Sequence, residues 1–243
     1  MNISKNGIII SESGYSESSS LISIITEDDE VLTSLVKSSK SSISKGKSSS
    51  LISGNVINFK HFARENSLGF IAYDNYKNFG SSLLSSHLKN LSMIMLSELA
   101  KYLPRYNHKI FLCFYEFLEK YSKEKDEITS SSILLLFLLK LLSILGYGIN
   151  IERCVVNNSS ENLEFVSPKS WHSVSKSASI GYEDKLLPLP KFLITMQNEN
   201  DKNELKKGVE LVFYFLNQKF INQHIKPPES LKMLQNCLIR TIK

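Results

Sequence analysis

Cysteine is rare and widely spaced in this chain of 243 residues. Cys113, Cys154 and Cys237 are the three that it contains. An odd number of distant cysteines argues against a disulfide framework and is typical of a reducing compartment. The N-terminus also lacks the small-residue cleavage site of a secretory signal, so we expect a cytoplasmic protein.

Long hydrophobic runs are missing as well. The most apolar stretch, residues 133–146, is interrupted by Lys140 and is shorter than the roughly 18 residues that a membrane-spanning helix needs. We interpret it as the buried helix of a globular core and expect no membrane partner. Hydrophobic residues make up 42% of the chain and charged residues 22%, which is typical of a folded protein whose core needs no disulfide or metal.

Several motifs that carry enzyme chemistry do not occur. The sequence has no Gly-x-Gly-x-x-Gly, no His-Glu-x-x-His and no Gly-x-Ser-x-Gly, the signatures of dinucleotide, zinc-protease and nucleophile-elbow sites. Gly46-Lys47-Ser48 matches the end of a phosphate-binding loop, but Ser41 stands where that motif needs a glycine. Cys154 has no second cysteine two to four residues away, whereas a structural zinc site needs four ligands. The residues therefore favour a protein without a metal or nucleotide cofactor.

The first third of the chain has the pattern of β-strands. Apolar and polar residues alternate most regularly in residues 56–62. Five short strands so close together indicate a small barrel or a sandwich. We expect them at residues 7–10, 20–26, 30–36, 56–62 and 67–73.

The pattern changes to a helical period near Gly80. Leucine and methionine recur on one helical face at positions 84, 88, 91, 95 and 99. Further helices are expected at residues 108–121, 128–145, 201–220 and 227–242, and the apolar helix 128–145 should lie at the centre of a bundle. Residues 154–190 have no helical period and are interpreted as an irregular or two-stranded insert. The chain is thus predicted to be an α+β protein, with a β domain followed by a helical domain.

The distribution of charge is the strongest functional signal. The net charge is +5, yet residues 31–64 contain no aspartate or glutamate. A mobile basic loop on a small barrel can follow a phosphate backbone and release its counterions, which gives affinity for nucleic acid of any sequence. The alternative is a solvated loop whose lysines only maintain solubility. The cations that we expect to contact nucleic acid are Lys37, Lys40, Lys45, Lys47, Lys60 and Arg64.

Aromatic residues lie on the strands beside this basic stretch. An exposed aromatic ring can stack on a nucleic-acid base, whereas most aromatic rings in small barrels fill the core. The sequence leaves both roles open for Phe59, Phe62, Phe70 and Tyr73.

Four segments, taken in order along the chain, resemble the bacterial RecO family of DNA repair proteins. The first contains the turn Tyr15-Ser-Glu-Ser18 between two apolar strands, and the second is the basic segment Leu35-Val-Lys-Ser-Ser-Lys40. The third combines Leu145-Gly-Tyr-Gly148 with Arg153-Cys154 and Val166-Ser-Pro-Lys-Ser170. The fourth is Leu186-Leu-Pro-Leu-Pro190 with the terminal helices.

This resemblance implies an OB-fold barrel at residues 1–78 and a helical domain at residues 79–243, with a small zinc-ribbon-like insert at about 152–190. Many relatives hold zinc in this insert with four cysteines. Only Cys154 matches them, so we expect the insert to be metal-free. Relatives often have arginine where Glu12 and Ser13 stand, which shifts the expected DNA contacts towards Lys37 through Lys47.

The resemblance also implies a function without bond-breaking catalysis, cofactor or small-molecule substrate. RecO-like proteins bind single- and double-stranded DNA and anneal complementary strands. They assist RecA loading together with RecR on DNA coated by single-strand-binding protein, and they bind the C-terminal tail of that protein. We therefore expect a nucleoid-associated recombination mediator.

Two other interpretations remain open on the sequence alone. The first is a protein-interaction adaptor of the repair machinery with little DNA affinity, because the acidic cluster at residues 27–30 adjoins the basic loop. The second is a nuclease, which would need clustered carboxylates to hold magnesium. Asp28 and Asp29 are the adjacent carboxylates of the β region that such a site would use.

Overall fold

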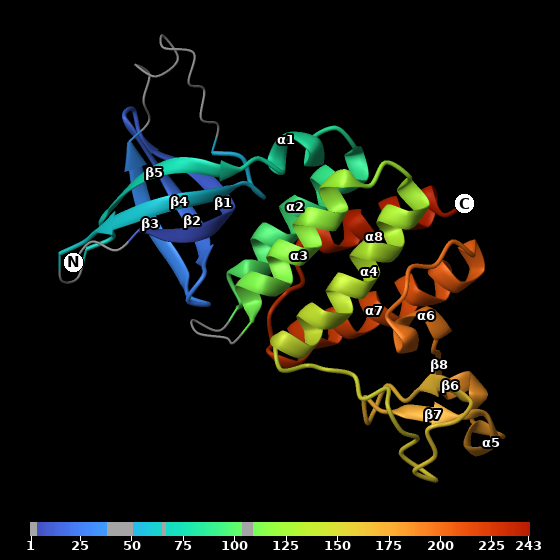
Figure 1. The fold of residues 1–243 in the computed structure, drawn as a ribbon. Coiled ribbons are helices and arrows are strands. Elements are labelled where there is room, and N and C mark those ends of the chain that lie inside the picture. The colour runs from blue at the N-terminus through green and yellow to red at the C-terminus, as the bar shows by residue number, and fades with distance from the viewer. Residues whose placement is uncertain (1–3, 38–50, 65–66, 104–108) are drawn as a thin grey trace. The chain divides into compact units, whose positions relative to one another are not determined.

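The computed structural model describes residues 4–37, 51–64, 67–103 and 109–243 (Figure 1). The chain forms two compact units, Met1–Lys123 and Glu124–Lys243. Lys40, Lys45 and Lys47 of the predicted basic loop lie outside the described residues.

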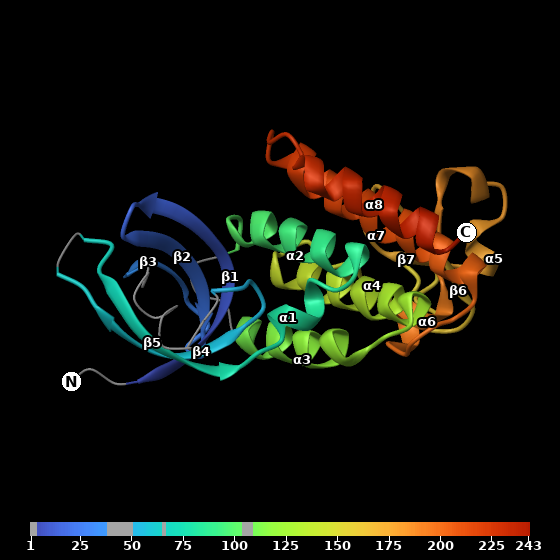
Figure 2. The same ribbon diagram turned by 90° about the horizontal axis from the view of Figure 1, so that it is seen from above.

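Five strands of the first unit form a closed barrel in the order β1-β2-β3-β5-β4 (Figure 2). Neighbouring strands are antiparallel except for β3 and β5, which are parallel. The strands are β1 (Lys5–Ser16), β2 (Ser19–Thr26), β3 (Val31–Lys37), β4 (Val56–Phe62) and β5 (Phe70–Lys77). This barrel confirms the predicted OB-fold and decides against a sandwich.

Alternating side chains fill the barrel because successive residues of a strand point to opposite faces. The buried cluster contains Ile9, Ile22, Ile24, Val36, Ile57, Phe59 and Ile71. The strand predicted at residues 67–73 begins later, at Phe70. Gly69 has a φ of +64°, and a Cβ atom there would lie 2.6 Å from the Phe62 carbonyl oxygen, so the chain turns at Gly69 before β5 starts.

Three helices complete the first unit: α1 (Gly80–Leu83), α2 (His87–Ala100) and α3 (Ile110–Lys123). The prediction that Leu84 belongs to the buried face of one continuous helix is wrong. Leu84 is 55% exposed at the end of α1, and α2 starts at His87. The amide of Gly80 donates a 2.7 Å hydrogen bond to the side chain of Asn55, which anchors α1 to the barrel as a separate turn.

The turn between β2 and β3 caps the start of α3. The carboxylate of Asp29 accepts hydrogen bonds from the backbone amides of Lys109, at 2.8 Å, and Phe111, at 2.9 Å. The first amides of a helix have no partner within the helix, and an acidic side chain satisfies them and interacts favourably with the helix dipole. Asp29 therefore attaches the barrel to the helices of its own unit.

We expect Asp29→Ala to lower the free energy of unfolding by about 2 kcal/mol, because two amides lose their acceptor. Asp28→Ala is the matched control, since Asp28 forms an exposed ion pair with Lys5 and such pairs contribute about 0–1 kcal/mol. Urea unfolding followed by circular dichroism measures both changes. An equal loss in the two variants would contradict the capping role.

The second unit is built around the apolar helix α4 (Glu127–Ile144). Helices α7 (Lys202–Asn222) and α8 (Glu229–Thr241) pack against it (Figure 2). By length and hydropathy α4 is the one candidate membrane span in the described part of the chain, and 61% of that span is buried in the protein. A buried core helix passes the same test.

The segment between α4 and α7 has more regular structure than the sequence predicted. It contains a three-stranded sheet in the order β7-β6-β8, with β6 (Leu163–Val166), β7 (Ser173–Ser175) and β8 (Leu187–Pro188). The short helices are α5 (Lys176–Ser179), the 3-10 turn η2 (Glu183–Lys185) and α6 (Lys191–Thr195). The prediction of two strands at most is therefore wrong, because strands of two to four residues are too short to produce a period.

One lysine of α7 lies inside the second unit. Lys219 is 1% exposed, and its Nζ atom stands 4.6 Å from the ring centre of Phe220. Burial disfavours the charged ammonium and lowers the pKa of Lys219 from 10.5 to about 8.

This burial predicts a pH dependence of stability. Between pH 8 and pH 10 the unfolded chain binds more protons at Lys219 than the folded chain does, so the free energy of unfolding rises with pH. Lys219→Met should remove this rise of stability between pH 8 and pH 10. Urea unfolding at several pH values checks this, with the exposed Lys206→Met as the control. Parallel pH profiles for Lys219→Met and the parent protein would contradict the prediction.

Candidate nucleic-acid interface

Three strands of the barrel place apolar side chains in one row on its outer surface. Phe70 on β5 lies directly opposite Leu35 on β3 and directly opposite Phe62 on β4. Residues that face each other across a sheet point to the same side. Phe62 is 45% and Phe70 is 43% exposed, whereas the next residue of β5, Ile71, is buried. The two phenyl rings therefore form an open platform on the barrel.

Predicted cations lie beside this platform. Lys60 is two residues before Phe62 on β4 and opposite Ala72, so it shares the outer face. Lys37 ends β3, two residues beyond Leu35. Arg64 lies two residues beyond β4, where its backbone amide donates to the Ser67 hydroxyl and that hydroxyl donates to the Arg64 carbonyl. We call this surface, with Leu35, Lys37, Lys60, Phe62, Arg64 and Phe70, the aromatic–basic face.

Lys37, Lys60 and Arg64 are exposed and take part in none of the ion pairs found among the described residues. Those pairs include Lys5–Asp28, Lys77–Glu119, Lys123–Glu119, Lys176–Glu164 and Lys207–Glu204. A cation without a carboxylate partner keeps its full attraction for a phosphate group. The aromatic–basic face therefore has the charge needed to bind a polyanion.

The four aromatic residues singled out in the sequence separate into two groups. Phe59 is 3% exposed and belongs to the barrel core, and the half-buried Tyr73 packs against that core. Phe62 and Phe70 are exposed on the aromatic–basic face. Strand parity explains the division, because Phe59 and Phe62 are three residues apart and point to opposite faces.

A cavity of about 690 Å³ adjoins the platform and contains residues that the sequence analysis did not select. Tyr15, at the end of β1, is 60% exposed, and Leu68 is 44% exposed; both line this cavity together with Phe62, Phe70 and Arg64. Tyr15 belongs to the turn at residues 15–18 that resembles the family, so the sequence did offer a reason to consider it as a site residue. Leu68 had no comparable signal, because only the fold brings it beside Phe62.

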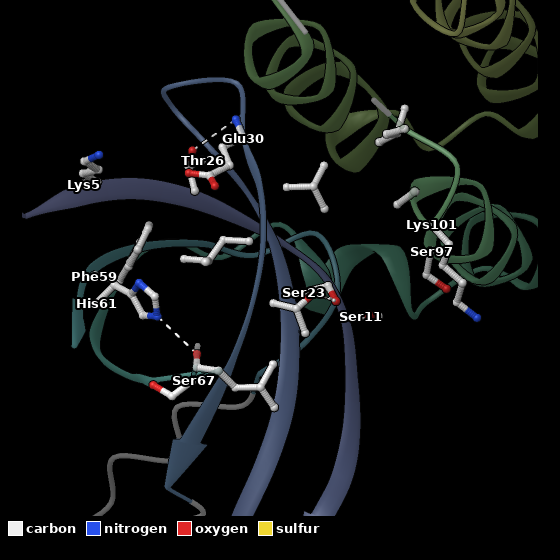
Figure 3. A pocket seen from close by; sticks show the side chains of 16 residues that line it. Lys5, Ser11, Ser23, Thr26, Glu30, Phe59, His61, Ser67, Ser97 and Lys101 are labelled. Carbon is white, nitrogen blue, oxygen red and sulfur yellow. Dashed lines mark hydrogen bonds between the residues drawn. The ribbon is translucent and has the colours of Figure 1, made fainter. Parts of the chain in front are cut away.

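A second, larger cavity of about 970 Å³ is lined by residues of β1, β2, β3, β4 and α2 (Figure 3). His61 and Leu68 line both cavities, and the His61 ring lies 3.3 Å from the Leu68 carbonyl oxygen. Its lining carries Lys5 and Lys101 but also Glu30. Because these charges are of mixed sign, the cations of the aromatic–basic face offer the better phosphate contacts.

The carboxylates considered for a nuclease have other roles in the structure. Both oxygens of Asp29 accept backbone amides at the start of α3, and Asp28 pairs with Lys5. Within the described ranges, no group of three histidine, cysteine, aspartate or glutamate side chains is arranged to hold a metal ion. The geometry of this turn thus gives no support to the magnesium-dependent alternative.

Fold and surface together define a class of protein: an OB-fold barrel with an aromatic and basic face, followed by helices. Residues 85–227 match the family model described as Recombination protein O C terminal. The chain is 30% identical over 228 residues to the DNA repair protein RecO of Ehrlichia chaffeensis, covering 89% of each chain. It is 28% identical over 236 residues to that of Rickettsia bellii strain OSU 85-389, covering 93% of this chain and 92% of the relative.

The same similarity extends to Wolbachia. The RecO protein of the strain wRi is 30% identical over 231 residues, which cover 92% of this chain and 94% of the relative. The chain belongs to the RecO family of DNA repair proteins, as its sequence segments indicated.

Proposed function

We propose that this protein is a recombination mediator that binds single-stranded DNA through the aromatic–basic face of its barrel. The observation that carries the proposal is the exposed pair Phe62 and Phe70, flanked by Lys37, Lys60 and Arg64. Proteins that bind single strands without sequence preference stack bases on aromatic rings and hold phosphates with cations. Lys40, Lys45 and Lys47 follow Lys37 directly in the sequence and are proposed to extend the phosphate contacts.

The proposed activity involves no covalent chemistry. Cations that neutralise phosphates allow two complementary strands, or a strand and a duplex, to approach and pair. In this proposal residues 1–78 bind DNA, and residues 79–243 bind the C-terminal tail of single-strand-binding protein. The protein assists RecA loading with RecR on coated DNA in the cytoplasm, without a metal or cofactor.

The salt dependence of binding tests the phosphate contacts. Each contact with a single strand contributes about 0.7 to the slope of log K against log salt. The variant Lys37→Ala/Lys60→Ala/Arg64→Ala should therefore bind more weakly and flatten that slope by about 2. Fluorescence anisotropy with labelled single-stranded DNA over a salt series measures both quantities.

A charge-matched control replaces exposed lysines of the second unit, Lys202, Lys206 and Lys232, by alanine. It should keep the parent slope. The variant Lys37→Ala/Lys40→Ala/Lys45→Ala/Lys47→Ala tests the loop, with an expected flattening of about 3. Unchanged DNA binding in both barrel variants would contradict the proposal. It would favour an adaptor that binds only the acidic tail peptide, and the same anisotropy assay with a labelled tail peptide detects that binding.

The aromatic pair makes a separate prediction. Phe62→Ala/Phe70→Ala should weaken binding of single-stranded DNA by about 10-fold or more, because stacking contributes about 1–3 kcal/mol per base. The slope against salt should stay unchanged, since no phosphate contact is lost. Both rings are exposed, so the thermal midpoint should also stay near that of the parent. Parent-like affinity in this folded variant would show that bases do not stack on these rings.

A further inference from the structure

The insert of the second unit holds a polar cluster that the DNA-binding proposal does not use. Cys154 is 2% exposed, and Ser175, at the end of β7, is also 2% exposed. The side-chain amide nitrogen of Asn157 donates to the Ser175 hydroxyl at 3.0 Å and to the Ser177 hydroxyl at 3.4 Å. The two serine hydroxyls are 3.3 Å apart. The side chains of Asn157 and Ser177, which are exposed, thus meet the buried Ser175 beside Cys154.

The sulfur of Cys154 is a hydrogen-bond acceptor next to Ser175. It receives hydrogen bonds from the side chain and backbone of Ser175 and from the backbone amides of Asn157 and Val156. Burial raises the pKa of the thiol, but these hydrogen bonds outweigh burial and lower the pKa to about 7. The surroundings of the sulfur therefore favour its negatively charged form, as donors around an anion do.

The cluster also joins segments that are distant in the sequence. The amide of Val155 donates to the Ser173 carbonyl at 2.9 Å, and the Ser173 hydroxyl donates to the Arg153 carbonyl at 2.8 Å. The loop at residues 153–157 is thereby attached to β7 on both sides of Cys154. A small sheet with strands of two to four residues needs such an attachment, because its own core is too small to hold it.

The donor set does not fit the zinc ion that related inserts hold. Structural zinc sites use four thiolate or imidazole ligands at about 2.0–2.3 Å, and this cluster offers one thiol, two hydroxyls and an amide. The amide group of Asn157 points its donor nitrogen at the two serines. The nitrogen of a carboxamide is a donor only, because its lone pair is delocalised into the carbonyl group, so it does not bind a metal.

We infer that hydrogen bonds among Cys154, Asn157, Ser175 and Ser177 replace a metal ion as the attachment that holds this insert together. The side-chain nitrogen of Asn157 and the hydroxyl oxygens of Ser175 and Ser177 lie 3.0–3.4 Å from one another. Four thiolates around zinc would be about 3.8 Å apart, given a zinc–sulfur distance of about 2.3 Å. These three side chains are therefore about as close to one another as the ligands of a zinc site, with hydrogen bonds in place of the ion.

The first test compares metal content and thermal stability of the full-length protein. Elemental analysis after incubation with equimolar zinc and desalting should find far less than one zinc per chain. The thermal midpoint should be the same with and without EDTA. Ser175→Ala and Asn157→Ala should each lower the midpoint by about 4 °C, the effect of one lost hydrogen bond in a unit of this size. The exposed Ser160→Ala, in the same insert, should leave the midpoint unchanged.

A second test uses gain of metal binding. The variant Asn157→Cys/Ser175→Cys/Ser177→Cys should bind about one zinc per chain, and EDTA should then lower its thermal midpoint. Stoichiometric zinc in the parent, or an EDTA-sensitive parent midpoint, would overturn the inference. So would a folded triple variant that binds no zinc, because the four positions would then not surround one point. None of these measurements involves DNA, so their outcome is independent of the proposed function.

Discussion

The pairing of β3 with β5 is the contact on which the DNA-binding surface depends. It joins Leu35 to Phe70 and Val36 to Ile71 in a parallel ladder, and the Leu35 amide bonds to the Gly69 carbonyl at 3.2 Å. Closing the barrel at this point brings the end of β3 beside the start of β5. Lys37 and Phe70 become neighbours on one surface only because this ladder forms. Gly69 makes the approach possible, since its positive φ turns the chain into β5.

The acidic residues Glu27, Asp28 and Asp29, which precede the basic stretch, form contacts that stabilise the fold. Asp29 caps α3, Asp28 pairs with Lys5, and Glu27 accepts a hydrogen bond from Asn6. Each carboxylate therefore has a partner at the β2–β3 turn, at the far end of β3 from Lys37. An electrostatic surface depends on where charges are placed as well as on their number. The modest net charge of +5 thus permits a locally basic face.

The insert of the second unit is stabilised differently from the helices around it. Strands of two to four residues bury too little apolar surface to be stable alone. Here the Ser173 hydroxyl donates to the Arg153 carbonyl and the Asn157 side chain donates to Ser175, which attaches the loop to β7. Val166 and Val174 add a small apolar core. The larger helices α4 and α7 follow the usual rule instead, since their apolar faces bury one another. One unit therefore combines a hydrophobic core with a polar attachment.

The sequence by itself determined the elements with a long and regular pattern. The barrel strands, the apolar helix α4 and helices α7 and α8 follow from periodicity alone, because side-chain period is a local property. The sequence also pointed to Lys37, Lys60 and Arg64, since residues 31–64 contain no aspartate or glutamate, and the structure exposes all three. It predicted the wrong helix start at Leu84, because the bond from Gly80 to Asn55 is a tertiary contact.

Only the tertiary structure decided which aromatic rings are available. Phe59 and Phe62 are the same residue type on the same strand, and the closure of the barrel buries Phe59 and leaves Phe62 exposed. It also joined Tyr15, Leu68 and Phe62 around one cavity, although they come from separate segments. The sequence singled out Cys154 but not its partners Asn157, Ser175 and Ser177, because serine and asparagine are abundant throughout the chain. Contacts between distant residues depend on how strands pair, and pairing is a property of the whole fold.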